Sequence, residues 1–125
     1  MDSRRDFARA SRLLRKKQFD EVLRGASVRT RRGPLRLAAR DNELEMARLG
    51  LIVGKRMLRR AVDRNRTKRV IRESFRQAGG LPAMDIVVHV AVPAAEVTAA
   101  DADGLFGALV EIVDRRRGLQ GPRVG

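Results

Sequence analysis

Residues 61–76 read AVDRNRTKRVIRESFR, and the spacing within this stretch organises the fold of the chain around it. At 100° per residue of an α-helix, one face about 100° wide collects Asn65, Lys68, Arg69, Arg72 and Arg76. The opposite side collects Thr67, Val70, Ile71, Ser74 and Ala78. The pattern predicts a helix that packs one face against a sheet and presents a basic face to solvent.

The basic face continues a dense run of positive charge, because residues 55–76 contain ten Lys or Arg. Only Asp63 and Glu73 oppose them. Like charges four residues apart on a helix cost about 0.2–0.5 kcal/mol per pair, a cost that a bound polyanion relieves. The alternative is an ordinary solvated helix face, but such faces usually mix charges of both signs. The stripe therefore favours a polyanion partner.

Composition points the same way. The chain has 125 residues, enough for one domain, and a net charge of +13. Residues 1–76 hold 24 Lys and Arg against 9 Asp and Glu, whereas residues 77–125 hold 4 against 6. Charge gathered in one part of the chain predicts one directed basic surface, with nucleic acid as the first candidate partner.

Several classes of protein lose support. The chain has no Cys, which excludes disulfides and thiolate chemistry and fits a reducing compartment. It shows no signal-peptide pattern and no apolar run long enough to span a bilayer, so we expect a cytoplasmic protein with no membrane contact. His89 is the only histidine and lies in a predicted strand, which favours a packed or edge residue over a metal ligand. No catalytic constellation stands out.

Periodicity predicts the element order α-β-β-β-α-β-α. The predicted elements are helices at 17–25, 61–76 and 96–117, and strands at 35–39, 44–47, 48–54 and 86–92. We expect one domain over residues 1–117, which begins with an irregular basic arm at 1–12, and a flexible tail at 118–125. Phe19 on the first helix is equally compatible with a core position and with base stacking.

The run KRMLRRAVDRNRTKRVIRESFR, residues 55–76, resembles the signature of the protein subunit of bacterial ribonuclease P. The resemblance lies in the Arg64–Arg66 tripeptide with Lys68, Arg69 and Arg72 after it. It extends to other segments: Arg12–Leu13, Phe19 with Val22, Arg48–Leu51 and Asp85–Val88. It therefore covers most of the chain.

This resemblance implies an α+β fold, a two-layer sandwich with a left-handed βαβ crossover, related to a domain of a small-subunit ribosomal protein. It implies two RNA partners, ribonuclease P RNA and precursor tRNA, and a monomeric protein in a 1:1 complex with the former. The family's holoenzyme removes the 5′ leader from precursor tRNA. The RNA carries the active site and Mg²⁺, so the protein is expected to have no catalytic residue and no tightly bound metal.

By the same resemblance, the residues expected to bind the catalytic RNA are Arg59, Arg60, Arg64, Asn65, Arg66, Lys68, Arg69, Arg72 and Arg76. Those expected to bind the leader, in a cleft between the first helix and the sheet, are Phe19, Leu23, Leu37, Lys55 and Arg56. Leu23 and Leu37 stand where the family often has aromatic residues, and Ala91–Val92 replace a common basic pair. These departures weaken base stacking and remove one phosphate contact.

Three other functions remain open on the residues alone. A ribosomal or other structural RNA-binding protein shares the charge pattern. A protein-only nuclease would need a clustered carboxylate site. A basic membrane-surface protein would need an apolar stripe that faces lipid.

Overall fold

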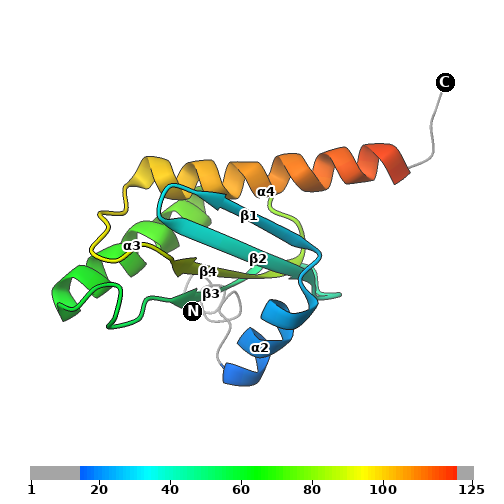
Figure 1. The fold of residues 1–125 in the computed structure, drawn as a ribbon. Coiled ribbons are helices and arrows are strands. Elements are labelled where there is room, and N and C mark those ends of the chain that lie inside the picture. Colours follow the sequence, from blue (N-terminus) through cyan, green and yellow to red (C-terminus); the bar gives the residue numbers. More distant parts are fainter. Residues whose placement is uncertain (1–14, 121–125) are drawn as a thin grey trace, which may run out of the picture.

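The computed structural model describes residues 15–120, and the basic arm predicted for residues 1–12 lies outside this range. The described elements follow the predicted order (Figure 1). The helices are α2 (Lys16–Gly25), α3 (Ala61–Gln77) and α4 (Ala99–Gln120), and the strands are β1 (Val28–Arg32), β2 (Leu35–Asp41), β3 (Arg48–Ile52) and β4 (Met84–Val90). None of these helices combines the length and apolar composition that crossing a bilayer requires.

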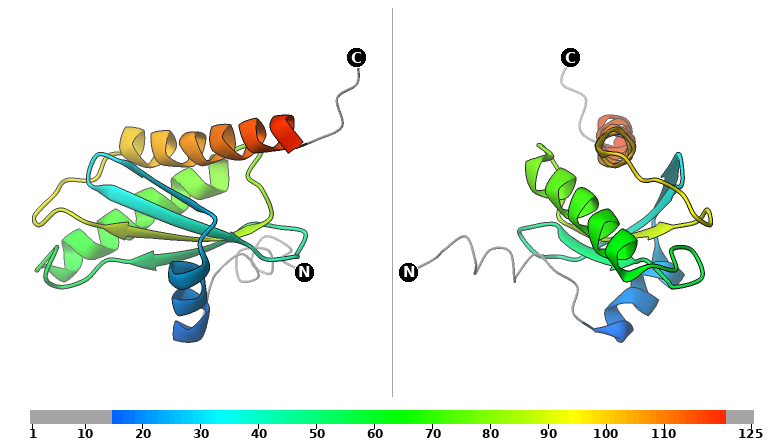
Figure 2. Two further views of the ribbon diagram at one scale, coloured as in Figure 1. Left: turned by 45° about the vertical axis from the view of Figure 1, so that its right-hand side comes forward. Right: turned by 90° about the vertical axis from the view of Figure 1, so that its left-hand side faces the viewer.

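The four strands form one sheet in the order β1-β2-β4-β3. β2 is antiparallel to both β1 and β4, whereas β3 is parallel to β4. A parallel pair of neighbouring strands needs a crossover connection, and α3 supplies it between β3 and β4. Helices α3 and α4 cover one face of the sheet, while α2 covers part of the other (Figure 2).

The first strand differs from the expectation. Residues 28–32 form β1, although this segment has few apolar residues and was not predicted as a strand. The strand predicted at 44–47 is absent from the described residues, so that prediction is wrong. β1 is an edge strand, where charged residues are common because they discourage pairing with another chain. Gly33 and Pro34 form its two-residue hairpin loop, and Gly33 has a φ of 55°. A positive φ before the fixed negative φ of proline is the sign pattern of a type II′ turn.

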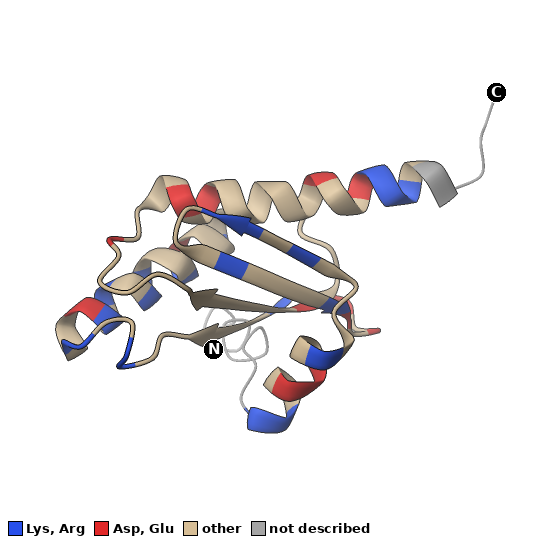
Figure 3. Cartoon of the chain, in the orientation of Figure 1, with Lys and Arg blue, Asp and Glu red and all other residues tan. Residues whose placement is uncertain are grey.

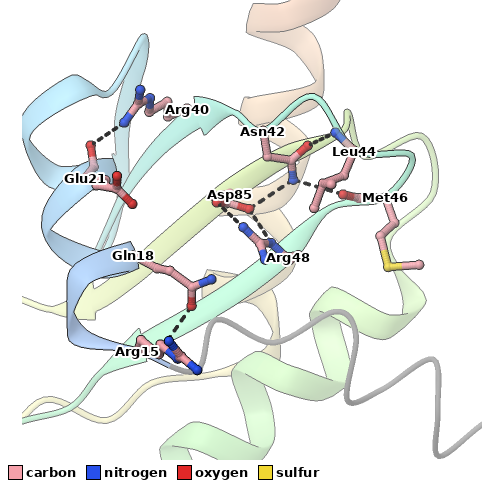
Figure 4. A network of polar contacts seen from close by, with 9 residues as sticks. All are labelled: Arg15, Gln18, Glu21, Arg40, Asn42, Leu44, Met46, Arg48 and Asp85. Atoms are coloured by element: carbon pink, nitrogen blue, oxygen red, sulfur yellow. Dashed lines mark hydrogen bonds and ion pairs between the residues drawn. The ribbon is translucent and has the colours of Figure 1, made fainter.

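The segment expected to be a strand at 44–47 is instead held as a turn by side chains (Figure 4). The Asn42 side-chain oxygen accepts a hydrogen bond from the Leu44 amide at 2.8 Å. Its side-chain nitrogen donates to the Met46 carbonyl at 3.1 Å and to Asp85 at 3.0 Å. Arg48 donates two further hydrogen bonds of 2.7 Å to the Asp85 carboxylate. This network fixes the entry into β3 against the start of β4.

The main core lies between the sheet and the pair α3 and α4. The face of α3 that was predicted to pack is buried at Thr67, Ile71 and Ser74. Phe75 joins it and meets Phe106 of α4 edge to face, with ring centroids 5.8 Å apart. Burial of this α3 face removes the apolar stripe that a membrane-surface helix would need.

The ends of α4 also differ from the prediction, which placed the helix at 96–117. The Thr98 hydroxyl accepts a hydrogen bond from the Asp101 amide at 3.1 Å, and the Asp101 carboxylate accepts one from the Thr98 amide at 3.0 Å. This reciprocal capping box starts the helix at Ala99. The helix continues to Gln120, so residues 118–120 belong to α4 and not to the expected tail.

Candidate nucleic-acid interface

The exposed side of α3 carries the predicted stripe. Asn65, Arg69, Arg72 and Arg76 are all exposed, and we call these four residues the α3 basic face. Together with Glu73 they line a shallow hollow of about 350 Å³. Lys68, which was predicted on the basic face, is half-buried. The buried side of α3 includes Phe75, so it is wider than predicted and extends to the position of Lys68.

Ion pairs neutralise only part of the positive charge on α3 and on the residue before it. Arg76 approaches Glu73 at 3.5 Å, and Arg60 approaches Asp63 at 3.8 Å. Such exposed pairs are worth about 0–1 kcal/mol, so they compete weakly with an incoming phosphate. In the part of the chain that the structure describes, the Arg69 side chain has no hydrogen-bond or ion-pair partner. Figure 3 shows Lys and Arg on α2, α3, β1 and β2 and at the C-terminal end of α4, while Asp and Glu are dispersed.

Arg64 has a structural contact that sequence reasoning missed. Its guanidinium donates hydrogen bonds to the carbonyl oxygens of Leu58 at 2.9 Å and Arg59 at 2.8 Å. The side chain is half-buried and ties the segment before α3 to the first turn of the helix. Arg64 therefore helps to shape the basic surface, whatever else it contacts.

A second hollow, of about 830 Å³, lies where α3 begins. Arg56, Arg59, Arg60 and Arg66 line it together with residues 93–96 of the loop after β4. Arg66 approaches Glu96 across this hollow at 3.9 Å. Arg56, which was expected to bind the leader, therefore lies with residues expected to bind the catalytic RNA.

Lys55 lies beside this hollow. It is exposed in the turn that follows β3. The strand ends at Ile52 and not at residue 54 as predicted, so Lys55 lies in a loop after the strand end.

On the other face of the sheet, α2 makes a small core of its own. Phe19 and Leu23 are half-buried and pack against Val22, Ala38 and Val87. This contact brings Phe19 to the sheet as expected, in a position that is partly core and partly accessible.

Leu37, which was also expected in the cleft with Phe19, is 2% exposed. Leu37 is buried in the main core with Val88, its partner in the sheet register. Successive side chains of a strand point to opposite faces, so Ala38 and Arg36 take the α2 side and Leu37 faces α3 and α4. Leu37 nevertheless borders the hollow on the α2 side, whose lining it shares with Leu23.

That hollow, of about 430 Å³, contains a basic group that the sequence reasoning did not assign. Its lining includes Leu23, Arg29, Arg31, Arg36 and His89, and we call it the α2-side hollow. The alternation of Arg29 and Arg31 in β1 could have identified it, had residues 28–32 been predicted as a strand.

His89 lies among cations in this hollow. It is half-buried, and burial, followed by the charge of Arg36, lowers the pKa of His89 below its ordinary value of 6.5. Among the described residues, no three His, Cys, Asp or Glu side chains group as potential metal ligands. The chemistry available to this surface is cationic recognition.

Comparison with known proteins agrees with this geometry. The family model described as ribonuclease P matches residues 7–114. The ribonuclease P protein component of Halorhodospira halophila is 49% identical over 113 residues, 90% of each chain. That of Legionella pneumophila is 48% identical over 82 residues, 66% of this chain and 70% of the relative. The structure of the Staphylococcus aureus RNase P protein aligns with a TM-score of 0.65 at 29% identity, covering 82% of this chain and 94% of that one. The chain belongs to the ribonuclease P protein family, whose members are protein components of the endoribonuclease that processes the 5′ end of tRNA.

Proposed function

We propose that the α3 basic face and the hollow at the start of α3 bind the catalytic RNA of ribonuclease P. The observation that carries this proposal is the α3 helix itself, which buries one face in the core and presents exposed Arg69, Arg72 and Arg76 on the other. Because the helix is anchored, the backbone positions of these arginines form a fixed row from which the side chains reach into solvent. Arginine suits phosphate recognition, since its planar fork can donate two hydrogen bonds to one phosphate.

The remaining predicted contacts extend this surface. Lys68 and Arg64 are half-buried beside it, so we assign them supporting contacts with the catalytic RNA. We assign the rest of the RNA contacts to Arg59, Arg60, Asn65 and Arg66, which are exposed. Lys55 and Arg56 lie next to this group and link it to the leader path.

The leader of precursor tRNA is proposed to follow the α2 side of the sheet, where Phe19 and Leu23 offer a partly accessible apolar surface. In this proposal the protein supplies binding and no chemical step. Mg²⁺ is held by the RNA subunit, where phosphate oxygens provide the hard ligands that it prefers. The protein acts as one copy per RNA in the cytoplasm, where precursor tRNA is made.

A reconstitution experiment tests this function. Precursor tRNA cleavage is measured at low Mg²⁺ with the protein alone, with a bacterial ribonuclease P RNA alone, and with both. We expect efficient cleavage only with both. Cleavage by the protein alone would indicate a protein active site, and failure to stimulate the RNA would favour a ribosomal or other structural RNA as the partner.

The α3 basic face is tested by its salt dependence. Replacing Arg69 and Arg72 by Ala should weaken binding to the catalytic RNA and flatten the slope of log K against log salt by roughly one to two units, because each lost phosphate contact removes about 0.9. The double variant Arg115→Ala/Arg117→Ala, at two exposed positions in the last turns of α4, controls for net charge. An unchanged slope in the double variant would remove the face from the interface.

A further inference from the structure

The α2-side hollow is lined by cations without a neutralising carboxylate. β1 contributes Arg29 and Arg31, β2 contributes Arg36, and β4 contributes His89. Among residues 15–120, no Asp or Glu lines this hollow. An unpaired group of like charges is unfavourable in the free protein, and an anion between them removes the repulsion.

The sheet register places His89 at the centre of this group. His89 pairs with Arg36 of β2 on one side and with Ile52 of β3 on the other. Arg31 of β1 is in turn the register partner of Arg36. Because paired residues project to the same face of a sheet, these side chains lie in one row across three hydrogen-bonded strand pairs.

The other neighbours of His89 cannot supply the missing negative charge. The Arg29 guanidinium donates a hydrogen bond of 2.5 Å to the Leu23 carbonyl at the end of α2. From α2, only Leu23 lines the hollow. On the same face of β4, Asp85 lies four residues away and is held by Arg48. Among the described residues, the side chains of Arg31, Arg36 and His89 make no hydrogen bond and no ion pair.

The chemistry of the hollow matches single-stranded RNA better than a duplex. Within it, the His89 ring and half-buried Leu23 offer non-polar surface for an unpaired base. Ile52, the neighbour of His89 on β3, lies outside the lining and is 39% exposed. Arg31 and Arg36 lie next to this surface, on the β1 and β2 side of His89, and can contact backbone phosphates there. A duplex keeps its bases stacked inside and offers no ring to such a site.

We propose that His89 and Arg36 contact a nucleotide of the single-stranded leader of precursor tRNA in the α2-side hollow, and that His89 takes up a proton as the leader binds. This inference rests on the proposed function. It adds a leader contact that is made by His89 and Arg36 and is linked to proton uptake. The free protein keeps His89 neutral among arginines, and the RNA phosphate supplies the counter-charge that favours the imidazolium form.

The sign of the linkage follows from the two protonation states. In the free protein, burial and Arg36 hold the pKa of His89 below 6.5. A bound phosphate favours the charged form and raises that pKa. The RNA-bound state therefore binds more protons between the two values, and leader affinity rises as the pH falls through this window. Well above the higher of the two pKa values the ring is neutral in both states and the linkage disappears.

The single histidine of the chain makes the first test direct. The imidazole resonance of an untagged protein is titrated by NMR, alone and with a short single-stranded RNA of leader sequence. We expect the titration midpoint to move upward with RNA by about one unit, which corresponds to about tenfold tighter binding to the protonated form. An unchanged midpoint with bound RNA would overturn the proton linkage.

The second test uses the holoenzyme. Affinities for precursor tRNA with a non-cleavable scissile linkage and for mature tRNA are compared from pH 5.5 to 8.5. The ratio of these two affinities reports the contribution of the leader to binding, because only precursor tRNA carries the leader. We expect this ratio to rise about tenfold toward low pH for the parent protein and to stay flat for His89→Gln and His89→Phe. Arg36→Gln should lower the ratio at every pH.

Two controls separate the possible failures. Arg117→Gln removes a charge elsewhere and should behave as the parent protein. Cleavage at pH 8 by RNA with and without protein checks the proposed function independently. If the protein stimulates cleavage but the ratio is flat with pH, or if His89→Gln keeps the parent pH dependence, the inference on His89 fails while the proposed function stands. If cleavage is not stimulated at all, the proposed function fails first.

Discussion

The network around Asp85 makes a quantitative prediction about stability. Its carboxylate accepts two hydrogen bonds from Arg48 and one from Asn42. The side chains of Arg48 and Asp85 are 21% and 14% exposed, so the pair lies between an exposed pair, worth about 0–1 kcal/mol, and a buried one, whose disruption costs about 3–5 kcal/mol. We therefore expect Asp85→Ala to lower the free energy of unfolding by about 2–3 kcal/mol.

The cost arises mainly from the donors left behind. Arg48 keeps its charge in a partly buried place, and its hydrogen bond with Asp85, the largest of the influences on it, raises the pKa of the guanidinium above its ordinary value. Asn42 loses one of the contacts that hold the turn before β3. The double variant Arg48→Met/Asp85→Ala should therefore lose less stability than the sum of the single variants, because it removes the unpaired charge.

Urea unfolding followed by circular dichroism measures these changes. With a slope of about 1–3 kcal/mol per molar urea, the midpoint of Asp85→Ala should fall by about 0.7–3 M. Asp114→Ala, an exposed substitution on α4, is the matched control and should stay within about 0.5 kcal/mol of the parent. If Asp85→Ala unfolds at the same urea concentration as this control, the reasoning about the network is refuted.

Three further changes test other parts of the structure. Gly33→Ala should cost at least about 1 kcal/mol in thermal or urea unfolding, since the residue has a φ of 55° and its new Cβ would approach the Asp101 carboxylate at 2.8 Å; a neutral result would contradict the assigned turn. Arg64→Ala removes both hydrogen bonds to the carbonyls before α3 and should cost about 1–2 kcal/mol, whereas Arg64→Lys should recover part of it. Phe19→Ala should weaken holoenzyme binding to precursor tRNA more than to mature tRNA, and equal losses would count against a leader contact.

The fold places the basic residues on two separate surfaces, whereas the sequence analysis predicted one directed basic surface. The α3 basic face and the hollow at the start of α3 belong to one side of the molecule. The α2-side hollow belongs to the opposite face of the sheet, because β-strand side chains alternate. A protein of this size can thus present one surface to a structured RNA and another to a single strand.

The local periodicity of the sequence was sufficient to predict the position of the central helix, α3. The predicted range 61–76 differs from α3 by one residue at its end, because a 3.6-residue repeat with two chemically distinct faces has few alternative structures. The predicted element order was also confirmed. The start of α4 was predictable in principle, because Thr98 and Asp101 have the spacing of a capping box.

β1 and Leu37 show where such reasoning stopped. An edge strand such as β1 buries little, so its sequence carries a weak apolar pattern and its strand character depends on pairing with β2. The face that Leu37 occupies depends on register, and a shift of one residue exchanges the two faces of a strand. The run 44–47 looked extended, yet the hydrogen bonds of Asn42 hold it as a turn.

The sequence by itself determined the family, the order of elements and the basic stripe of α3, because these depend on residue identity and on repeats within a single helix. The tertiary structure alone decided which cations are paired, which face Leu37 takes and that Arg36 meets His89. Those properties depend on strand pairing between segments far apart in the chain, and burial and charge at each position are set by neighbours that no local pattern specifies.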